Sequence, residues 1–172
     1  MRIKEVQYQR LFTLGNYNNE RIGFVAEVNE NEDANKVLGE LFFKVLDVED
    51  CLETYRFLLR RIININEQIE HTERDIARTQ SRIAELKVTI DELVEKIKKG
   101  DYDARLRHAC ETESLKTLNE RLEDYKNLLE KQNREKKELQ QKLNELAERI
   151  KNGNFSLEGL EIQRPKQDFD FY

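Results

Sequence analysis

Residues 62–97 read IININEQIEHTERDIARTQSRIAELKVTIDELVEKI, and apolar residues or threonine recur in this stretch at alternating steps of three and four. One heptad position is isoleucine in every repeat, and a second run with the same spacing covers residues 115–150. Such spacing, sustained over five heptads, is typical of a coiled coil. The expected core residues are Ile62, Ile65, Ile69, Ile76, Ile83, Leu86, Ile90, Leu93, Ile97, Leu115, Leu118, Leu122, Tyr125, Leu129, Leu139, Leu143, Leu146 and Ile150.

A short breaker separates the two runs. Residues 100–103 read GDYD, which favours the end of the first helix, and Thr112 or Ser114 could cap the second. A short connection favours antiparallel packing within one chain. The sequence therefore predicts an antiparallel coiled-coil hairpin over residues 59–151, with its tip at about 100–114.

The pairing register of this hairpin has two solutions. Pairing residues whose numbers sum to 208 gives a short tip but places Arg61 near Arg149, which repel each other. Pairing to a sum of 215 lengthens the tip and brings Arg82 near Glu135, which attract. On the flanking charges we favour the sum of 215, although exposed pairs contribute only ~0.3 kcal/mol each.

Four polar residues interrupt the core stripe, and in either register they fall at one level of the hairpin. Such a layer can fix the register or the number of partners at a cost in stability. It is compatible with a tolerated wet layer and also with a bend or a docking point for a third helix. These residues are Thr72, Thr79, Gln132 and Lys136.

The N-terminal residues have a different period. Val6 and Tyr8 alternate with polar residues, and apolar residues recur at every second position from Ile22 to Val28, which predicts a β-hairpin over about residues 3–29. A helix over about 33–47 would cover it, because one hairpin cannot bury its face alone. The cap-like residues 47–50 could bend or restart that helix. We expect a ββα head domain at 1–58, and hence an α+β fold that is mostly α.

The C-terminal part, residues 152–172, begins with an Asn-Gly-Asn helix stop. Its apolar residues between 155 and 162 could return to the head, and its last five residues alternate acid with aromatic. This ending resembles the C-terminal tips of bacterial single-stranded DNA-binding proteins, which recruit partners through acids and a terminal aromatic. The candidate partner-binding residues are Tyr8, Arg10, Phe12, Tyr17, Phe169, Phe171 and Tyr172.

The first thirty residues also carry a motif. The stretches YQRLF (8–12), LGNY (14–17) and ERIG (20–23) resemble the N-terminal motif of small, functionally unassigned proteins of phage and bacterial mobile or defence loci. The resemblance implies a phage-like or accessory setting, and no activity or catalytic residue comes with it.

Composition and charge narrow the classes of function that this chain could have. The net charge is -5, and the helical region carries no basic stripe of the kind that binds the phosphate backbone of nucleic acids. No apolar run is long enough for a membrane span and no signal peptide is visible, so we expect a cytoplasmic protein. Cys51 and Cys110 build no disulfide framework. His108 and Cys110 could supply half of an intermolecular metal site, which needs four ligands, and we expect ordinary tip residues instead.

We therefore expect a non-enzymatic interaction or scaffold protein without catalytic residues, metal or cofactor. Its partner would be another protein, a second copy, or both, and a homo-oligomer fits a small head with exposed helices. The alternative is a nucleic-acid-associated accessory factor of a phage, mobile element or defence system, because aromatic and basic residues share the N-terminal hairpin.

Overall fold

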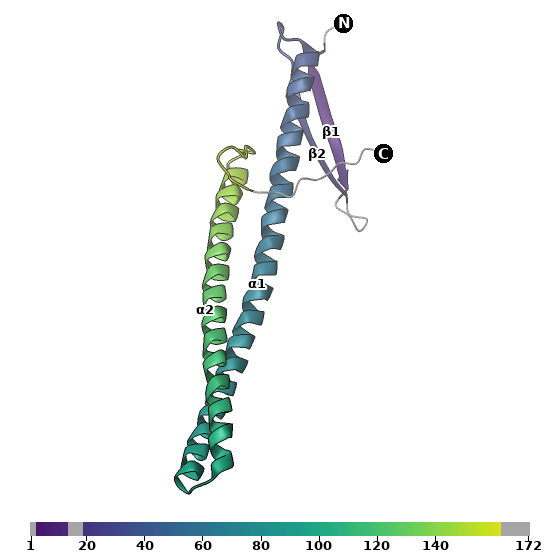
Figure 1. Cartoon of the computed structure of the whole chain (residues 1–172). Helices are drawn as coiled ribbons and strands as arrows, with labels where there is room; N and C mark the ends of the chain where they lie inside the picture. The colour runs from purple at the N-terminus through teal and green to yellow at the C-terminus, as the bar shows by residue number, and fades with distance from the viewer. Residues whose placement is uncertain (1–2, 14–18, 163–172) are drawn as a thin grey trace. The chain divides into compact units, whose positions relative to one another are not determined.

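The computed structural model describes residues 3–13 and 19–162. The chain forms β1 (Glu5–Thr13), β2 (Asn19–Glu27), α1 (Ala34–Lys98) and α2 (Tyr102–Lys151) (Figure 1). This confirms the predicted α+β class, a β-hairpin followed by a helical hairpin. The chain divides into two compact units, which we call the head unit (Met1–Arg60 and Gln140–Tyr172) and the stalk unit (Arg61–Leu139). The expected boundary at 151 differs, since the last turns of α2 belong with the head unit.

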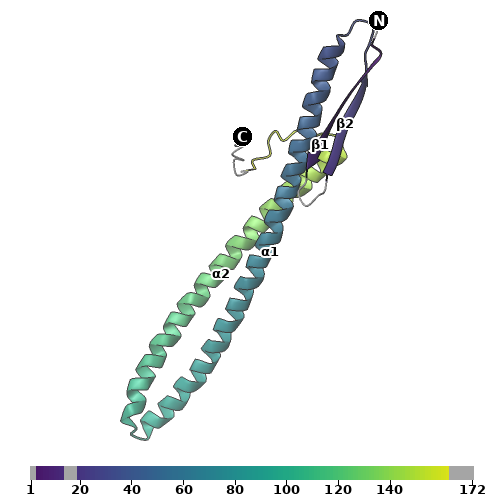
Figure 2. The ribbon, with the colours of Figure 1, turned by 90° about the vertical axis from the view of Figure 1, so that its right-hand side faces the viewer.

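In the stalk unit α1 and α2 run side by side in opposite directions, as both ribbon views show (Figures 1 and 2). The heptad stripe faces inward: Ile62, Ile65, Ile69, Ile83 and Leu93 are buried. The remaining expected core residues of this unit are half-buried, which is usual for the narrow seam between only two helices. These are Ile76, Leu86, Ile90, Ile97, Leu115, Leu118, Leu122, Tyr125, Leu129 and Leu139.

The turn between the helices is much shorter than the predicted tip at 100–114. α1 ends at Lys98 and α2 begins at Tyr102. Gly100, with φ 92°, donates its N–H to the Ile97 carbonyl, and the Asp101 N–H bonds the Lys96 carbonyl. The Asp101 carboxylate then accepts the Ala104 N–H at 3.1 Å, which caps α2. Thr112 and Ser114, the predicted caps, lie inside α2.

Both predicted registers are wrong. The Arg61 guanidinium pairs with the Glu135 carboxylate, and these residue numbers sum to 196 rather than 208 or 215. The short turn explains the difference, because the helix ends at Lys98 and Tyr102 fix a sum near 200 along an antiparallel hairpin. Ala104, buried directly after the turn, extends the α2 stripe toward its N-terminus. Its small side chain made it hard to recognise as a core residue from the sequence.

The polar residues of the seam do not lie at one level in this register. A sum near 200 places Thr72 beside Leu129 and Gln132 beside Ile69. Thr72 and Thr79 are buried, and each hydroxyl donates to the carbonyl four residues earlier, at 3.0 and 2.7 Å. Lys136 is half-buried. Gln132 is buried, and its Oε1 accepts no hydrogen bond within the described part of the chain.

The head unit packs the β-hairpin against one helix. β1 and β2 pair antiparallel with Tyr8 opposite Phe24, and the hairpin lies alongside α1 (Figure 2), where Tyr8 contacts Phe42. The Asp33 carboxylate caps α1 by accepting the Asn35 N–H at 2.9 Å. α1 then continues through residues 47–50 without the predicted bend, because Val45, Val48 and Cys51 keep the buried stripe unbroken.

The end of α2 and the following segment complete the head unit. Leu146 is fully buried, Leu143 is buried and Ile150 is half-buried. Gly153, with φ 71°, ends α2, and the Asn154 N–H bonds the Arg149 carbonyl at 2.8 Å. Arg149 Nη1 then donates to the carbonyls of Ser156 and Glu158, at 3.1 and 2.8 Å. Residues 154–158 therefore fold back, as the predicted return segment requires.

Candidate interaction site

An aromatic pair lies on the surface of the head unit. The rings of Phe42 and Phe43 meet edge to face with centroids 5.4 Å apart, and Phe42 makes a second such contact with Tyr8. Phe43 is 65% exposed and Phe42 is 37% exposed. Aromatic side chains contribute most to stability when buried, so Phe43 adds little to the fold of the single chain. We call Phe42, Phe43 and the neighbouring exposed Leu38 the aromatic patch.

The structure places only part of the predicted partner-binding set. Tyr8 is half-buried against Phe42, and Arg10 Nη1 lies 3.5 Å from the Glu49 carboxylate. Both side chains therefore hold the hairpin to α1. Glu20 pairs with Arg56 in the same way. Phe12 belongs to β1, but its side chain lies outside the described part, as do Tyr17, Phe169, Phe171 and Tyr172.

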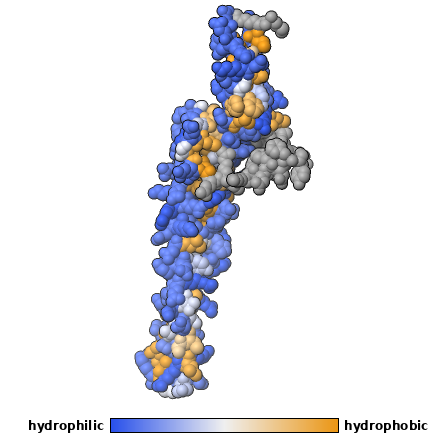
Figure 3. Space-filling view, turned by 45° about the horizontal axis from the view of Figure 1, so that its top comes forward, coloured by the Kyte–Doolittle hydropathy of each residue, from blue (hydrophilic) through white to orange (hydrophobic). Residues whose placement is uncertain are grey.

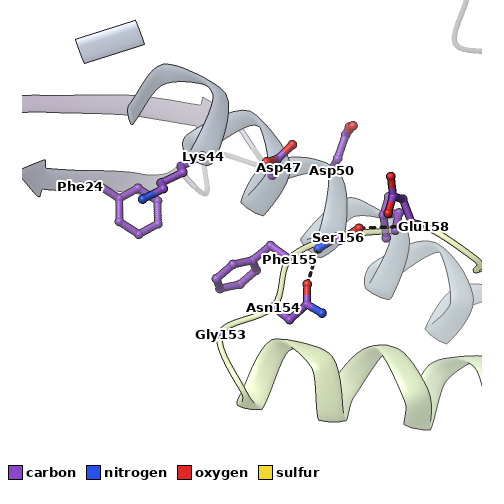
Figure 4. Close-up of a pocket in the computed structure, with 10 residues that line it drawn as sticks. Phe24, Lys44, Asp47, Asp50, Gly153, Asn154, Phe155, Ser156 and Glu158 are labelled. Atoms are coloured by element: carbon purple, nitrogen blue, oxygen red, sulfur yellow. Dashed lines mark hydrogen bonds between the residues drawn. The ribbon is translucent and has the colours of Figure 1, made fainter. Parts of the chain in front are cut away.

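A pocket of about 710 Å³ lies in the head unit among β2, α1 and residues 153–158 (Figure 4). Phe24 comes from β2, whereas Lys44, Asp47 and Asp50 project from successive turns of α1. Phe155 and Leu157 supply the apolar part of the opposite wall. The pocket thus combines aromatic and charged side chains in its lining.

Local hydrogen bonds hold the segment that forms this wall. The Asn154 carboxamide oxygen accepts the Ser156 N–H at 3.0 Å, and the Ser156 hydroxyl accepts the Glu158 N–H at 3.2 Å (Figure 4). Together with the two bonds from Arg149, they fix residues 154–158 beside the end of α2. The wall therefore has a defined shape without a bound partner.

Charge is uneven along this part of α1. Five of the charged residues between 40 and 53 are acidic, and Lys44 is the one base among them. Burial raises the pKa of Glu49 above its ordinary value, Arg10 opposes the shift, and the carboxylates of Glu53 and Asp50 add to it. This surface is therefore acidic, which disfavours phosphate backbones and favours cations.

The stalk unit carries fewer exposed apolar groups. Figure 3 shows its visible surface as mostly hydrophilic, with hydrophobic atoms gathered at the end that carries the turn. Val88, Tyr102, Leu106 and Leu128 are exposed there and along the helices. Val94 is half-buried.

The residues considered for a metal lie inside α2 rather than in a loop. His108 is half-buried and Cys110 is exposed, while Cys51 is buried in the head unit. Within residues 3–13 and 19–162, no three His, Cys, Asp or Glu side chains gather as metal ligands would. Neither the pocket nor the aromatic patch could be predicted from the sequence, because each depends on segments brought together by the fold.

Comparison with known proteins identifies no relative of this chain. No protein-family model, curated protein or solved structure matches the chain. Neither of the described helices contains a stretch long and apolar enough to cross a lipid bilayer. Function must therefore be inferred from the surfaces described above.

Proposed function

We propose that this chain is a non-enzymatic scaffold that assembles with further copies of itself through the aromatic patch of its head unit. The observation that carries the proposal is the exposure of Phe43, which is 65% accessible while its neighbour Phe42 is anchored by Tyr8. An aromatic held in place by packing and exposed at its face is typical of residues that dominate protein interfaces.

Burial of this patch would relieve the exposure of several large apolar side chains at once. Leu38, Phe42 and Phe43 lie within two turns of α1, and each apolar Å² removed from water contributes about 25 cal/mol. A twofold contact would bury the patch of both copies against each other. The stalk would then hold the assembled heads apart or bring further partners together.

The alternative role on nucleic acid has less support. Arg10 and Arg56 of the head unit pair with Glu49 and Glu20, so their charge is largely used within the chain. The acidic stretch of α1 would also repel a phosphate backbone. A nucleic-acid factor would need a basic surface, which the described part of the head does not offer.

Sedimentation velocity of the wild-type chain and two variants tests the proposal. Phe43→Glu places a charge in the aromatic patch, and Val88→Glu places one at a similarly exposed apolar site of the stalk. We expect the wild type and Val88→Glu to sediment as the same oligomer and Phe43→Glu to sediment as a 20.6 kDa monomer. A monomeric wild type, or dissociation by Val88→Glu alone, would overturn the proposal.

A further inference from the structure

The pocket of the head unit has a charge pattern that self-assembly through the aromatic patch leaves unused. Asp47 on α1 and Glu158 on the return segment both line it. Lys44 is the single base among the described lining residues. These two acids come from segments far apart in the sequence, so their place in one pocket is a product of the fold.

The pocket also has an apolar lining. Phe24 and Phe155 line the pocket from β2 and from the return segment, and Leu157 lies beside Phe155 in the chain (Figure 4). A group that satisfies such a site has an apolar stem and a cationic end. Arginine fits best, because its guanidinium stacks on aromatic rings and binds carboxylates through several donors.

The site is also formed before any ligand arrives. Arg149 donates to the carbonyls of Ser156 and Glu158, and the Asn154 and Ser156 side chains bind the backbone between them. These bonds are made to main-chain atoms, and the Glu158 side chain lines the pocket. A ligand would therefore not need to order the wall when it binds.

We propose that this pocket binds an arginine side chain from a basic segment of a partner protein. This goes beyond self-assembly, because it gives the scaffold a second partner of defined chemistry. Charge complementarity selects a cationic segment, and the aromatic walls select arginine over a fully hydrated ammonium.

The test is a titration of the ¹⁵N-labelled full chain with the tripeptide Ac-Gly-Arg-Gly-NH₂, followed by NMR. We expect saturable shifts of the amide signals of residues 153–158 that weaken at high salt. Ac-Gly-Gln-Gly-NH₂ should give none. The variant Asp47→Asn/Glu158→Gln should weaken binding roughly threefold or more, because two exposed charge pairs are removed.

A matched variant separates local from general charge effects. Glu73→Gln/Glu130→Gln changes the net charge by the same amount at exposed sites of the stalk and should bind like the wild type. Equal weakening in both double variants, or equal shifts with the Gln tripeptide, would overturn the proposal. The titration reads the pocket alone, so its failure in a chain that still assembles would leave the proposed function standing. Saturable binding by a wild-type chain that is monomeric at every concentration would do the reverse.

Discussion

The Arg61 guanidinium contacts the Glu135 carboxylate, although 74 residues separate them in the chain. This pair joins α1 to α2 inside the stalk unit and shows how the two heptad stripes meet. The pair is exposed, so it contributes little to stability by itself. It serves as a marker of the register.

The register can be tested by cross-linking. In a Cys110→Ser background, Arg61→Cys/Glu135→Cys should form an intrachain cross-link with a short bis-maleimide, detected by peptide mass spectrometry of the monomer band. Arg82→Cys/Glu135→Cys should not, because the two α1 positions are about 30 Å apart along the helix. The opposite result would restore the register with a sum of 215.

Gln132 should make the protein less stable than an apolar residue at the same position would. Its buried Oε1 has no donor among the described residues, and an unpaired buried polar group costs about 1–3 kcal/mol. Gln132→Leu should therefore raise the free energy of unfolding by roughly 1–2 kcal/mol in urea titrations. Gln80→Leu, at an exposed position of α1, should change it by less than about 0.5 kcal/mol. Equal effects would mean that the gain comes from helix propensity.

Leu146 should be essential to the head unit. Its side chain is fully buried, and truncation to alanine leaves a cavity that typically costs about 2–5 kcal/mol. Leu106→Ala, on the same helix but 64% exposed, should cost far less. Thermal unfolding of both variants by circular dichroism checks this, and similar midpoints would contradict the assignment of the end of α2 to the head core.

The raised pKa of Glu49 predicts that the free energy of unfolding depends on pH. Burial raises its pKa above the ordinary value of 4.5, so the folded state binds this proton more tightly than the unfolded state. Its contribution to stability is complete below pH 4.5 and is lost as the pH rises through the raised pKa. Glu49→Gln should therefore gain stability relative to the wild type as the pH rises from 4.5. Urea unfolding at several pH values measures this, and a constant difference would contradict it.

Much of the fold was predictable because its signals are periodic. The isoleucine heptads predicted the helical hairpin, and the alternation around Tyr8 and Phe24 predicted the β-hairpin. The tip and register were not predictable from flanking charges, since each pair contributes too little to decide. The decisive feature was Gly100 followed by Asp101, a helix stop joined directly to a helix cap.

The candidate sites were harder to predict for a different reason. In the sequence, the aromatic patch has the spacing of an ordinary core stripe. Only the structure shows that the β-hairpin leaves Phe43 exposed. The pocket joins β2, α1 and residues 153–158, and neither spacing nor composition links those segments. Arg10 was predicted to bind a partner, but its ion pair with Glu49 depends on the packing of the hairpin on α1.

The molar mass of the wild-type chain by light scattering, over a series of dilutions at low and high salt, tests self-assembly most directly. We predict a multiple of 20.6 kDa that persists at high salt, because the proposed contact is apolar rather than ionic. A mass of 20.6 kDa at every concentration would contradict the scaffold and leave the aromatic patch without its proposed partner.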